Sequence, residues 1–221
     1  MEEDRDCITL SKILQLADLR DQEVLEIGCG DGRITTQLVG KAKRVVAIDP
    51  DAAIIAKAKE NTKGVSLRIG SGECLEFPSE SFDIILFTLS LHHQDSSLAL
   101  REVKRVLRDH GRVVILEPVN DGEIEQVCNL LRNEAQVLQD TAHAIEASDF
   151  EVERSEVFYT CWEFENDKEL YEWLFSYYQK PFDNTLVVLI RKFLGDKVKA
   201  SPIILQDKIR IVSLRNQSNQ G

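Results

Sequence analysis

Short apolar runs and amphipathic segments alternate along the first 118 residues of the chain. The apolar runs are typical of buried parallel strands and lie at 23–28, 44–49, 65–69, 82–87 and 112–118. Around and between them, apolar residues at helical spacing predict helices at 8–19, 33–40, 51–63 and 96–109. Gly111 is expected to end the last of these helices. Strands that alternate with helices predict an α/β fold with a doubly wound, mostly parallel sheet.

The second half of the chain has a different pattern. Residues 121–147 read as one long helix, and 150–164 alternate as an exposed strand does. Two further helices are predicted at 167–178 and 183–195, followed by a strand at 207–216. The polar ending QSNQG is expected to fray.

Aromatic residues are concentrated in this second half. Eleven of the fifteen lie between Phe150 and Phe182, including both tryptophans and all four tyrosines. They can form the core of a helical addition, or they can line an apolar substrate pocket beneath it. The two interpretations are compatible, because the core of a cap can face a pocket.

Composition narrows the classes of partner. The formal net charge of −11 disfavours nucleic acid and favours a small molecule or a protein as substrate. No stretch approaches the roughly 18 apolar residues that a membrane helix needs. The acidic start MEEDRDCITL lacks the apolar core of a secretory signal. The five cysteines include no CxxC pair, so we expect reduced thiols, a cytoplasmic protein and no metal site.

The stretch VLEIGCGDGR, residues 24–33, has the setting of a nucleotide-binding loop, because glycines follow a predicted strand and precede a helix. The dinucleotide fingerprint is GxGxxG, whereas this loop reads GxGxG and has Arg33 where the third glycine would stand. In doubly wound sheets, ligands bind beyond the carboxyl ends of the strands, where the strand order reverses. The loop is therefore expected to hold a nucleotide other than a dinucleotide.

Five stretches, in order, resemble the motifs of one enzyme family. They are VLEIGCGDGR, VVAIDPD, GSGECLEFP, SFDIILFTLSLHH and ALREVKRVLRDHGRVVILEP. Together they resemble class I S-adenosylmethionine-dependent methyltransferases, in the branch called the methyltransferase type 11 domain family. The resemblance is close over roughly residues 10–118.

The resemblance implies a Rossmann-like, seven-stranded sheet of order 3-2-1-4-5-7-6 with an antiparallel seventh strand. It implies one methyltransferase domain over 1–221. Residues 1–120 would form the cofactor-binding core, and 121–221 would complete the sheet and insert a helical cap. The cap helices, about 167–195, would cover the acceptor site.

The resemblance also assigns residues to S-adenosylmethionine, which would leave as S-adenosylhomocysteine. Glu26 would accept hydrogen bonds from the cofactor ammonium, directly or through water. Asp49 would chelate the ribose 2′- and 3′-hydroxyls, and Ile48 and Pro50 would border the adenine. The backbone of the loop would pass beneath the methionine and ribose through Gly28, Cys29, Gly30 and Gly32.

The third motif departs from the family pattern, because Ser71 stands where an aspartate is usual and Gly72 follows it. The Ser71 hydroxyl can still accept a hydrogen bond from the adenine amino group, and Glu73 matches the family glutamate. Phe87 and Thr88, at the end of the fourth strand, are expected to contact the methionine part of the cofactor.

Methyl transfer needs a base only where the acceptor must lose a proton near attack. His92 and His93 follow the fourth strand and are the candidate catalytic residues, since imidazole titrates near neutral pH. Packing or a structural hydrogen bond is the alternative role for both. Glu117 is a further candidate for substrate contact.

Three functions remain open from the sequence. The leading hypothesis is transfer of a methyl group to a small, partly apolar acceptor by in-line displacement. A non-catalytic S-adenosylmethionine-binding sensor or assembly partner is the first alternative, and a nicotinamide oxidoreductase is the second. The acceptor and the oligomeric state are not encoded in the shared motifs.

Overall fold

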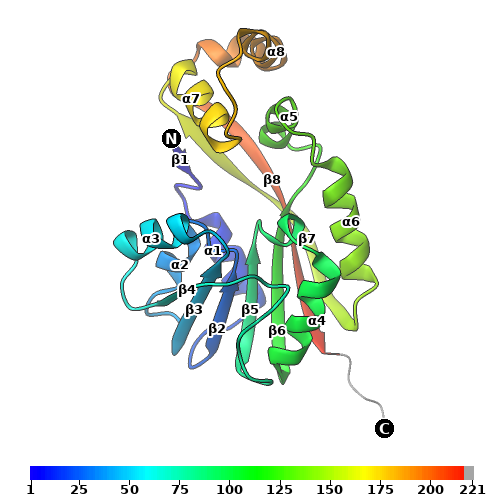
Figure 1. Ribbon diagram of the computed structural model, residues 1–221. Helices are drawn as coiled ribbons and strands as arrows, with labels where there is room; N and C mark the ends of the chain where they lie inside the picture. Colours follow the sequence, from blue (N-terminus) through cyan, green and yellow to red (C-terminus); the bar gives the residue numbers. More distant parts are fainter. Residues whose placement is uncertain (217–221) are drawn as a thin grey trace. The chain divides into compact units, whose positions relative to one another are not determined.

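The structure is a computed structural model that describes residues 1–216 (Figure 1). Among these residues, eight strands are hydrogen-bonded in the order β1-β7-β8-β6-β5-β2-β3-β4. Five are mutually parallel: β2 (Glu23–Ile27), β3 (Arg44–Asp49), β4 (Ser66–Ile69), β5 (Phe82–Thr88) and β6 (Leu107–Pro118). The others are β1 (Glu2–Glu3), β7 (Phe150–Phe164) and β8 (Ile203–Asn216). Figure 1 shows β7 and β8 running in opposite directions.

Helices connect most of these strands. They are α1 (Ile8–Leu16), α2 (Arg33–Leu38), α3 (Ala52–Asn61), α4 (Ser96–Val106), α5 (Glu123–Asn129), α6 (Ala135–Glu146), α7 (Asp167–Tyr177) and α8 (Asn184–Leu194). Two 3₁₀ turns, η1 (Leu91–His93) and η2 (Gly195–Lys199), complete the set. Asp or Asn side chains accept backbone N–H bonds at the starts of α3, α4, α7 and α8, which satisfies donors that a helix leaves unpaired.

The chain forms two compact units. The sheet unit comprises Leu10–Glu117, Gln139–Glu156 and residues 210–216. The helical unit comprises Met1–Thr9, Pro118–Leu138 and Val157–Ile209. The long strands β7 and β8 each contribute residues to both units.

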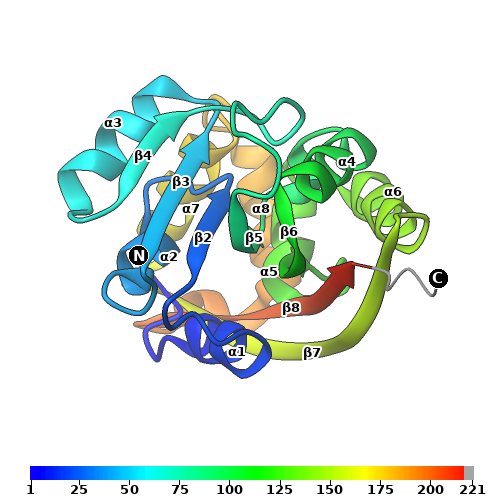
Figure 2. The ribbon, with the colours of Figure 1, turned by 90° about the horizontal axis from the view of Figure 1, so that it is seen from below.

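Side-chain alternation along the central strands builds two apolar layers in the sheet unit. Leu25, Ile27, Ile85 and Phe87 pack with the apolar face of α4 and with Ile145 of α6. Ala47 and Leu67 point the opposite way and pack with α3. Figure 2 shows α4 and α6 on one side of the central strands and α1 on the other. Because the five strands are parallel, their carboxyl ends lie at one edge of this layered core.

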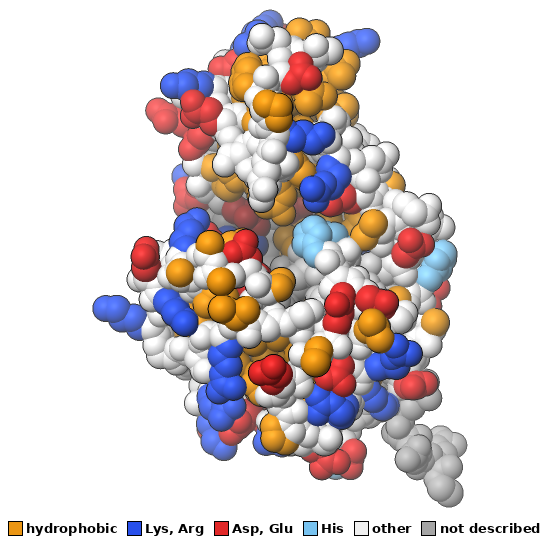
Figure 3. All heavy atoms as spheres, viewed as in Figure 1, with side chains coloured by type: hydrophobic (Ala, Val, Ile, Leu, Met, Phe, Trp, Pro, Cys, Tyr) orange, Lys and Arg blue, Asp and Glu red, His pale blue; other side chains and the backbone are white. Residues whose placement is uncertain are grey.

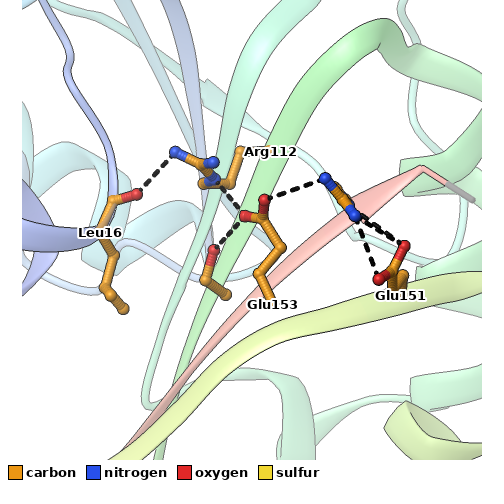
Figure 4. Close-up of polar contacts among 6 residues, drawn as sticks. Leu16, Arg112, Glu151 and Glu153 are labelled. Atoms are coloured by element: carbon orange, nitrogen blue, oxygen red, sulfur yellow. Dashed lines mark hydrogen bonds and ion pairs between the residues drawn. The ribbon is translucent and has the colours of Figure 1, made fainter.

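A chain of charged side chains ties α1 to the strands (Figure 4). Arg112 on β6 donates to the carbonyl oxygen of Leu16 at 2.8 Å and to Glu153 on β7 at 2.8 Å. Ser213 on β8 donates to the same carboxylate, and Arg215 pairs with Glu151. Arg112 therefore joins the end of α1 to the edge of the sheet.

The seven-stranded prediction is corrected to eight strands. The two-residue strand β1 pairs antiparallel with β7, Glu2 opposite Glu163 and Glu3 opposite Trp162. Two acidic residues carry no strand pattern of their own, so this pairing depends on the partner strand. The predicted last strand also begins earlier, at Ile203 rather than 207.

Two predicted helices end differently. The expected helix over 121–147 divides into α5 and α6, because Asn129 accepts from the Glu134 N–H and Asn133 accepts from the Ala135 N–H. Helix α4 stops at Val106, because the N–H groups of residues 80 and 81 donate to carbonyls at 105 and 106. Gly111 lies within β6 and ends no helix. The predicted fraying of QSNQG falls outside the described residues.

Candidate functional site

The glycine loop follows β2 and is bonded to the end of β3. The backbone N–H groups of Gly28 and Cys29 both donate to the carbonyl of Ile48, at 2.8 and 3.0 Å. Gly28 has φ of +74°, and a Cβ added to it would lie 2.3 Å from the Ser90 Cβ. Gly30 has φ of +54°, yet an added Cβ there would meet nothing within 4 Å. The loop is therefore closed on its protein side at Gly28 and open at Gly30.

Asp49 closes β3 beside the loop. Its carboxylate accepts the Gly30 N–H at 3.0 Å through one oxygen and the Asp51 N–H at 3.0 Å through the other. The side chain is half-buried. Each carboxylate oxygen has a second lone pair, so the group can accept further hydrogen bonds while the loop holds its orientation.

Glu26 lies beneath the loop and is fully buried. Thr35 from α2 donates to one carboxylate oxygen at 2.6 Å, and Thr88 from β5 donates to the other at 2.8 Å. Burial raises the pKa of Glu26, and the two hydroxyl bonds oppose that shift. The carboxylate thus links two strands and a helix at the predicted site.

The loop after β4 joins the same edge. Gly70 donates to the Asp49 carbonyl at 3.1 Å, and the Ser71 hydroxyl accepts the Glu73 N–H at 3.3 Å. Glu73 itself is exposed and accepts the Asp95 N–H at 2.6 Å, immediately before α4. A Cβ on Gly72 would lie 2.4 Å from Gln94 Oε1. Glu73 therefore holds the loop against the turn that precedes α4, and the absence of a side chain at Gly72 leaves room for Gln94.

The turn after β5 is held from two neighbouring strands. Leu89 donates its N–H to the Leu116 carbonyl on β6 at 3.0 Å, and the Ser90 hydroxyl donates to the Ile27 carbonyl on β2 at 2.6 Å. Phe87 is fully buried, whereas Thr88 is half-buried. Leu89 has φ of +60°, a left-handed conformation that is costly for a residue with a branched side chain.

The two candidate histidines lie in η1, directly after this turn. His92 is buried and its Nδ1 contacts Glu117 Oε2, while Glu117 Oε1 accepts the Leu91 N–H at 3.0 Å. His93 is exposed, and its ring centroid lies 3.9 Å from that of His92. The structure therefore distinguishes two residues that the sequence left equivalent.

The structure brings the sequence-predicted residues to one edge of the sheet unit. Sequence reasoning missed Thr35 and Ser90, whose hydroxyls bond to Glu26 and to the backbone of residue 27. A hydroxyl in the first turn after a glycine loop is the one local signal for Thr35. Pro50 is exposed beside Asp49. Cys29 is buried, which raises the pKa of its thiol to about 12, so the thiol stays protonated near neutral pH.

Among residues 1–216, no three His, Cys, Asp or Glu side chains gather so that they could hold a metal ion. Within the same residues, none of the helices has the length and apolar character needed to cross a membrane.

Comparison with known proteins adds independent evidence. The family model described as "Methyltransferase domain" matches residues 25–115. An uncharacterized methyltransferase of Staphylococcus carnosus is 35% identical over 127 residues, 55% of this chain and 60% of that protein. An uncharacterized methyltransferase of Schizosaccharomyces pombe is 39% identical over 101 residues, 42% of this chain and 38% of that protein. The match thus spans between about two fifths and three fifths of the length of these relatives.

The fold is shared more widely than the sequence. The crystal structure of the YcgJ protein from Bacillus subtilis superposes with a TM-score of 0.67 at 20% identity, covering 96% of this chain and 99% of that one. At this level of identity the likeness concerns the fold. It supports a Rossmann-like core for the sheet unit.

Proposed function

We propose that this chain, which the family model described as "Methyltransferase domain" matches over residues 25–115, transfers a methyl group from S-adenosylmethionine to a small, partly apolar acceptor. The observation that carries the proposal is the Gly30–Asp49 pair, because it sets an oriented carboxylate beside an open backbone. An acceptor-only group that has lone pairs to spare suits a pair of ribose hydroxyls. The buried Glu26 beneath the loop suits an ammonium group.

The residues fit the cofactor on their own geometry. Asp49 would chelate the ribose hydroxyls, and the backbone at Gly30 would pass close beneath the ligand. Glu26 would attract the ammonium group, either itself or through the Thr88 hydroxyl that it holds. Ile48 and Pro50 would border the adenine, and the Ser71 hydroxyl would accept a hydrogen bond from its amino group. When bound, S-adenosylmethionine supplies an activated methyl group and leaves as S-adenosylhomocysteine, so the protein mainly supplies position and orientation.

The helical unit carries an aromatic cluster that suits part of an apolar acceptor. Its core is rich in aromatic residues: Trp162, Phe164, Tyr171, Phe175 and Tyr178 are buried. Trp173 packs edge-on against Trp162, with ring centroids 4.8 Å apart, and stacks on the exposed Tyr177. The half-buried Trp173 and the exposed Tyr177 are the accessible part of this cluster, and such aromatic surface suits a partly apolar molecule.

A small acceptor also agrees with the distribution of charge. On the face drawn in Figure 3, Lys and Arg side chains lie among Asp and Glu side chains. The chain as a whole carries a formal net charge of −11, which opposes binding to a phosphate backbone. A cytoplasmic location stays a prediction from the sequence.

A two-step experiment tests this function against its alternatives. Calorimetric titration with S-adenosylmethionine, S-adenosylhomocysteine and NAD comes first. We expect saturable binding of the first two and none of NAD; binding of NAD alone would reverse the proposal. Incubation with methyl-labelled S-adenosylmethionine and a metabolite extract follows, with mass identification of the product. Binding without any S-adenosylhomocysteine formation would favour the non-catalytic alternative.

A further inference from the structure

A cavity lies in the sheet unit between α4 and the junction of α6 with β7. Its volume is about 390 Å³, which is within the range of sites that bind small molecules. One face of α4 and residues between 144 and 150 line it, and all of them belong to the sheet unit. Figures 1 and 2 both draw α4 beside α6. None of the lining residues is assigned to S-adenosylmethionine or to catalysis, so the cavity is a separate feature of the fold.

The floor of the cavity is apolar. Leu100 and Phe150 line it and also pack in the core of the sheet unit, where they are 3% and 6% exposed. Ala144 and Ala147 line it from α6 and the residue that follows α6, and their small side chains leave the space open. A ligand that covers this floor gains by removing apolar surface from water, so we expect a ligand with an apolar body.

The face of α4 that borders the cavity carries two positive charges. Ser97, Leu100, Arg101 and Lys104 recur at helical spacing and therefore share this face. Arg101 and Lys104 are one turn apart, and like charges at this distance on a helix repel each other. An anion bound beside both side chains would offset that repulsion.

Lys104 is held at the edge of the cavity. Its Nζ donates to the Asp149 carbonyl at 3.0 Å and lies 5.1 Å from the centroid of the Phe150 ring. An ammonium group has three N–H donors, so the bond to the carbonyl leaves donors for a ligand. The cation is thus oriented by the junction of α6 with β7 before any ligand binds.

Arg101 lies one turn before Lys104 and is exposed. The neighbouring acid on α4, Glu102, pairs with Arg105 at 2.7 Å and accepts the Leu75 N–H at 2.9 Å. Among the described residues, no hydrogen bond or ion pair engages the Arg101 guanidinium. Its fork of N–H donors matches the two oxygens of a carboxylate.

The charge of the cavity favours a ligand with one negative charge. Asp149 is the acid among the lining residues, and it offsets one of the two positive charges. A carboxylate therefore fits the remaining charge better than a phosphate with two negative charges does.

We propose that this cavity binds a small carboxylic acid with an apolar body. The carboxylate accepts hydrogen bonds from Arg101 and Lys104. The apolar body lies on Leu100 and Phe150. This inference goes beyond the proposed methyl transfer and does not depend on it, because the two sites share no residue.

Four related compounds test the chemistry of the cavity. The nitrogen-15-labelled full chain is titrated with hydrocinnamate, hydrocinnamide, acetate and phenethyl phosphate, and backbone amide signals are followed by NMR. Hydrocinnamate should give saturable shifts at residues 97–104 and 147–150. The amide and acetate should bind about tenfold more weakly or worse, because the first lacks the charge and the second lacks the apolar body. Absence of saturable shifts at these residues, or tighter binding of the amide or the phosphate, would overturn the proposal.

Two exposed positions provide variants that should keep the fold. Arg101→Met retains an apolar stem and removes the charge, so hydrocinnamate affinity should fall about tenfold. Ala147→Leu fills part of the cavity and should weaken binding to a similar extent. Lys59→Met, exposed on α3, is the control and should bind as wild type does. Unchanged affinity in Arg101→Met and Ala147→Leu would show that hydrocinnamate does not bind in this cavity, which would overturn the inference.

Discussion

Gly30 and Asp49 belong to different strand–loop units, yet the backbone N–H of the first donates to the carboxylate of the second at 3.0 Å. The bond orients the carboxylate beside the open side of the loop. In Asp49→Asn the amide keeps one acceptor but loses the charge, so two charge-assisted bonds to ribose should weaken. We expect S-adenosylmethionine affinity to fall about 10- to 100-fold, measured by calorimetry.

Asp109→Asn is the control for this change, because Asp109 is exposed and lies near the start of β6 rather than its end. It should leave the affinity unaltered. Equal losses of S-adenosylmethionine affinity in both variants would contradict the proposed binding of ribose by Asp49.

Gly30 and Gly40 allow a matched pair of substitutions. Both have positive φ, +54° and +74°, and an added Cβ at either meets nothing within 4 Å. Gly30→Ala and Gly40→Ala should therefore cost similar stability, roughly 1–2 kcal/mol, through backbone strain alone. Only Gly30→Ala should weaken S-adenosylmethionine binding, by more than tenfold, because its methyl group enters the proposed ligand space. Similar affinities for the two variants would place the ligand elsewhere.

Glu26 should make stability depend on pH in a defined direction. Burial raises its pKa in the folded state above the ordinary value, so the folded protein binds the proton more tightly than the unfolded chain. Stability from this group is therefore largest at low pH and is lost as pH rises through the folded pKa. The Tm of Glu26→Gln minus the Tm of wild type should therefore be larger at pH 8 than at pH 5. Each kcal/mol of difference in the free energy of unfolding corresponds to about 2–4 °C in Tm.

The opposite trend, with Glu26→Gln gaining at pH 5, would show that the two threonine hydroxyls lower the pKa more than burial raises it. Cofactor affinity should fall in the same variant. The stability and binding effects are separable, because only the first is measured without ligand.

Of the charged side chains in Figure 4, Arg112 should contribute more to the free energy of unfolding than Arg215. Arg112 bonds to Glu153 and to the Leu16 carbonyl at the end of α1. Arg215 instead pairs with Glu151 and, at 3.7 Å, with Glu153, and within residues 1–216 it forms no hydrogen bond or ion pair to α1. Arg112→Met should cost about 1 kcal/mol, and Arg215→Met less than about 0.5 kcal/mol. Chemical denaturation at neutral pH measures both, and equal costs would contradict the bridging role.

At acidic pH, the difference in the free energy of unfolding between Arg112→Met and wild type should become smaller. The Arg112 guanidinium holds the pKa of Glu153 below its usual range in the folded protein. The stabilisation from this pair is therefore fully present when the pH is above the pKa of Glu153 in the unfolded chain, and it is lost as the pH falls through the lower pKa of the folded state.

Trp173 tests the acceptor role of the helical unit. Trp173→Ala removes a half-buried ring that packs on Trp162 and Tyr177. Once an acceptor is identified, its KM should rise about tenfold, whereas the affinity for S-adenosylhomocysteine should not change. Ser176→Ala, exposed on the same helix, serves as the control. An unchanged KM in Trp173→Ala would show that the aromatic cluster does not bind the acceptor.

The parallel strands and the cofactor loop were predictable because their signals are local. A short apolar run such as 44–49 is buried wherever it pairs, and it forms β3 with the predicted bounds. The glycine spacing after residue 27 likewise requires a tight loop whatever surrounds it. The order of the predicted strands reappears in the sheet, extended by β1.

Tertiary structure decided the features that depend on partners distant in the chain. The pairing of β1 with β7 brings residues 2 and 163 together. Helix α4 ends at Val106 because the N–H groups of residues 80 and 81 donate hydrogen bonds to its last carbonyl groups. The break between α5 and α6 depends on two asparagine side chains that turn back to the backbone. His92 and Glu117 stand 25 positions apart, and nothing in the sequence pairs them. Periodicity reports which face of an element is buried, whereas a hydrogen bond between two elements exists only once the sheet has assembled them.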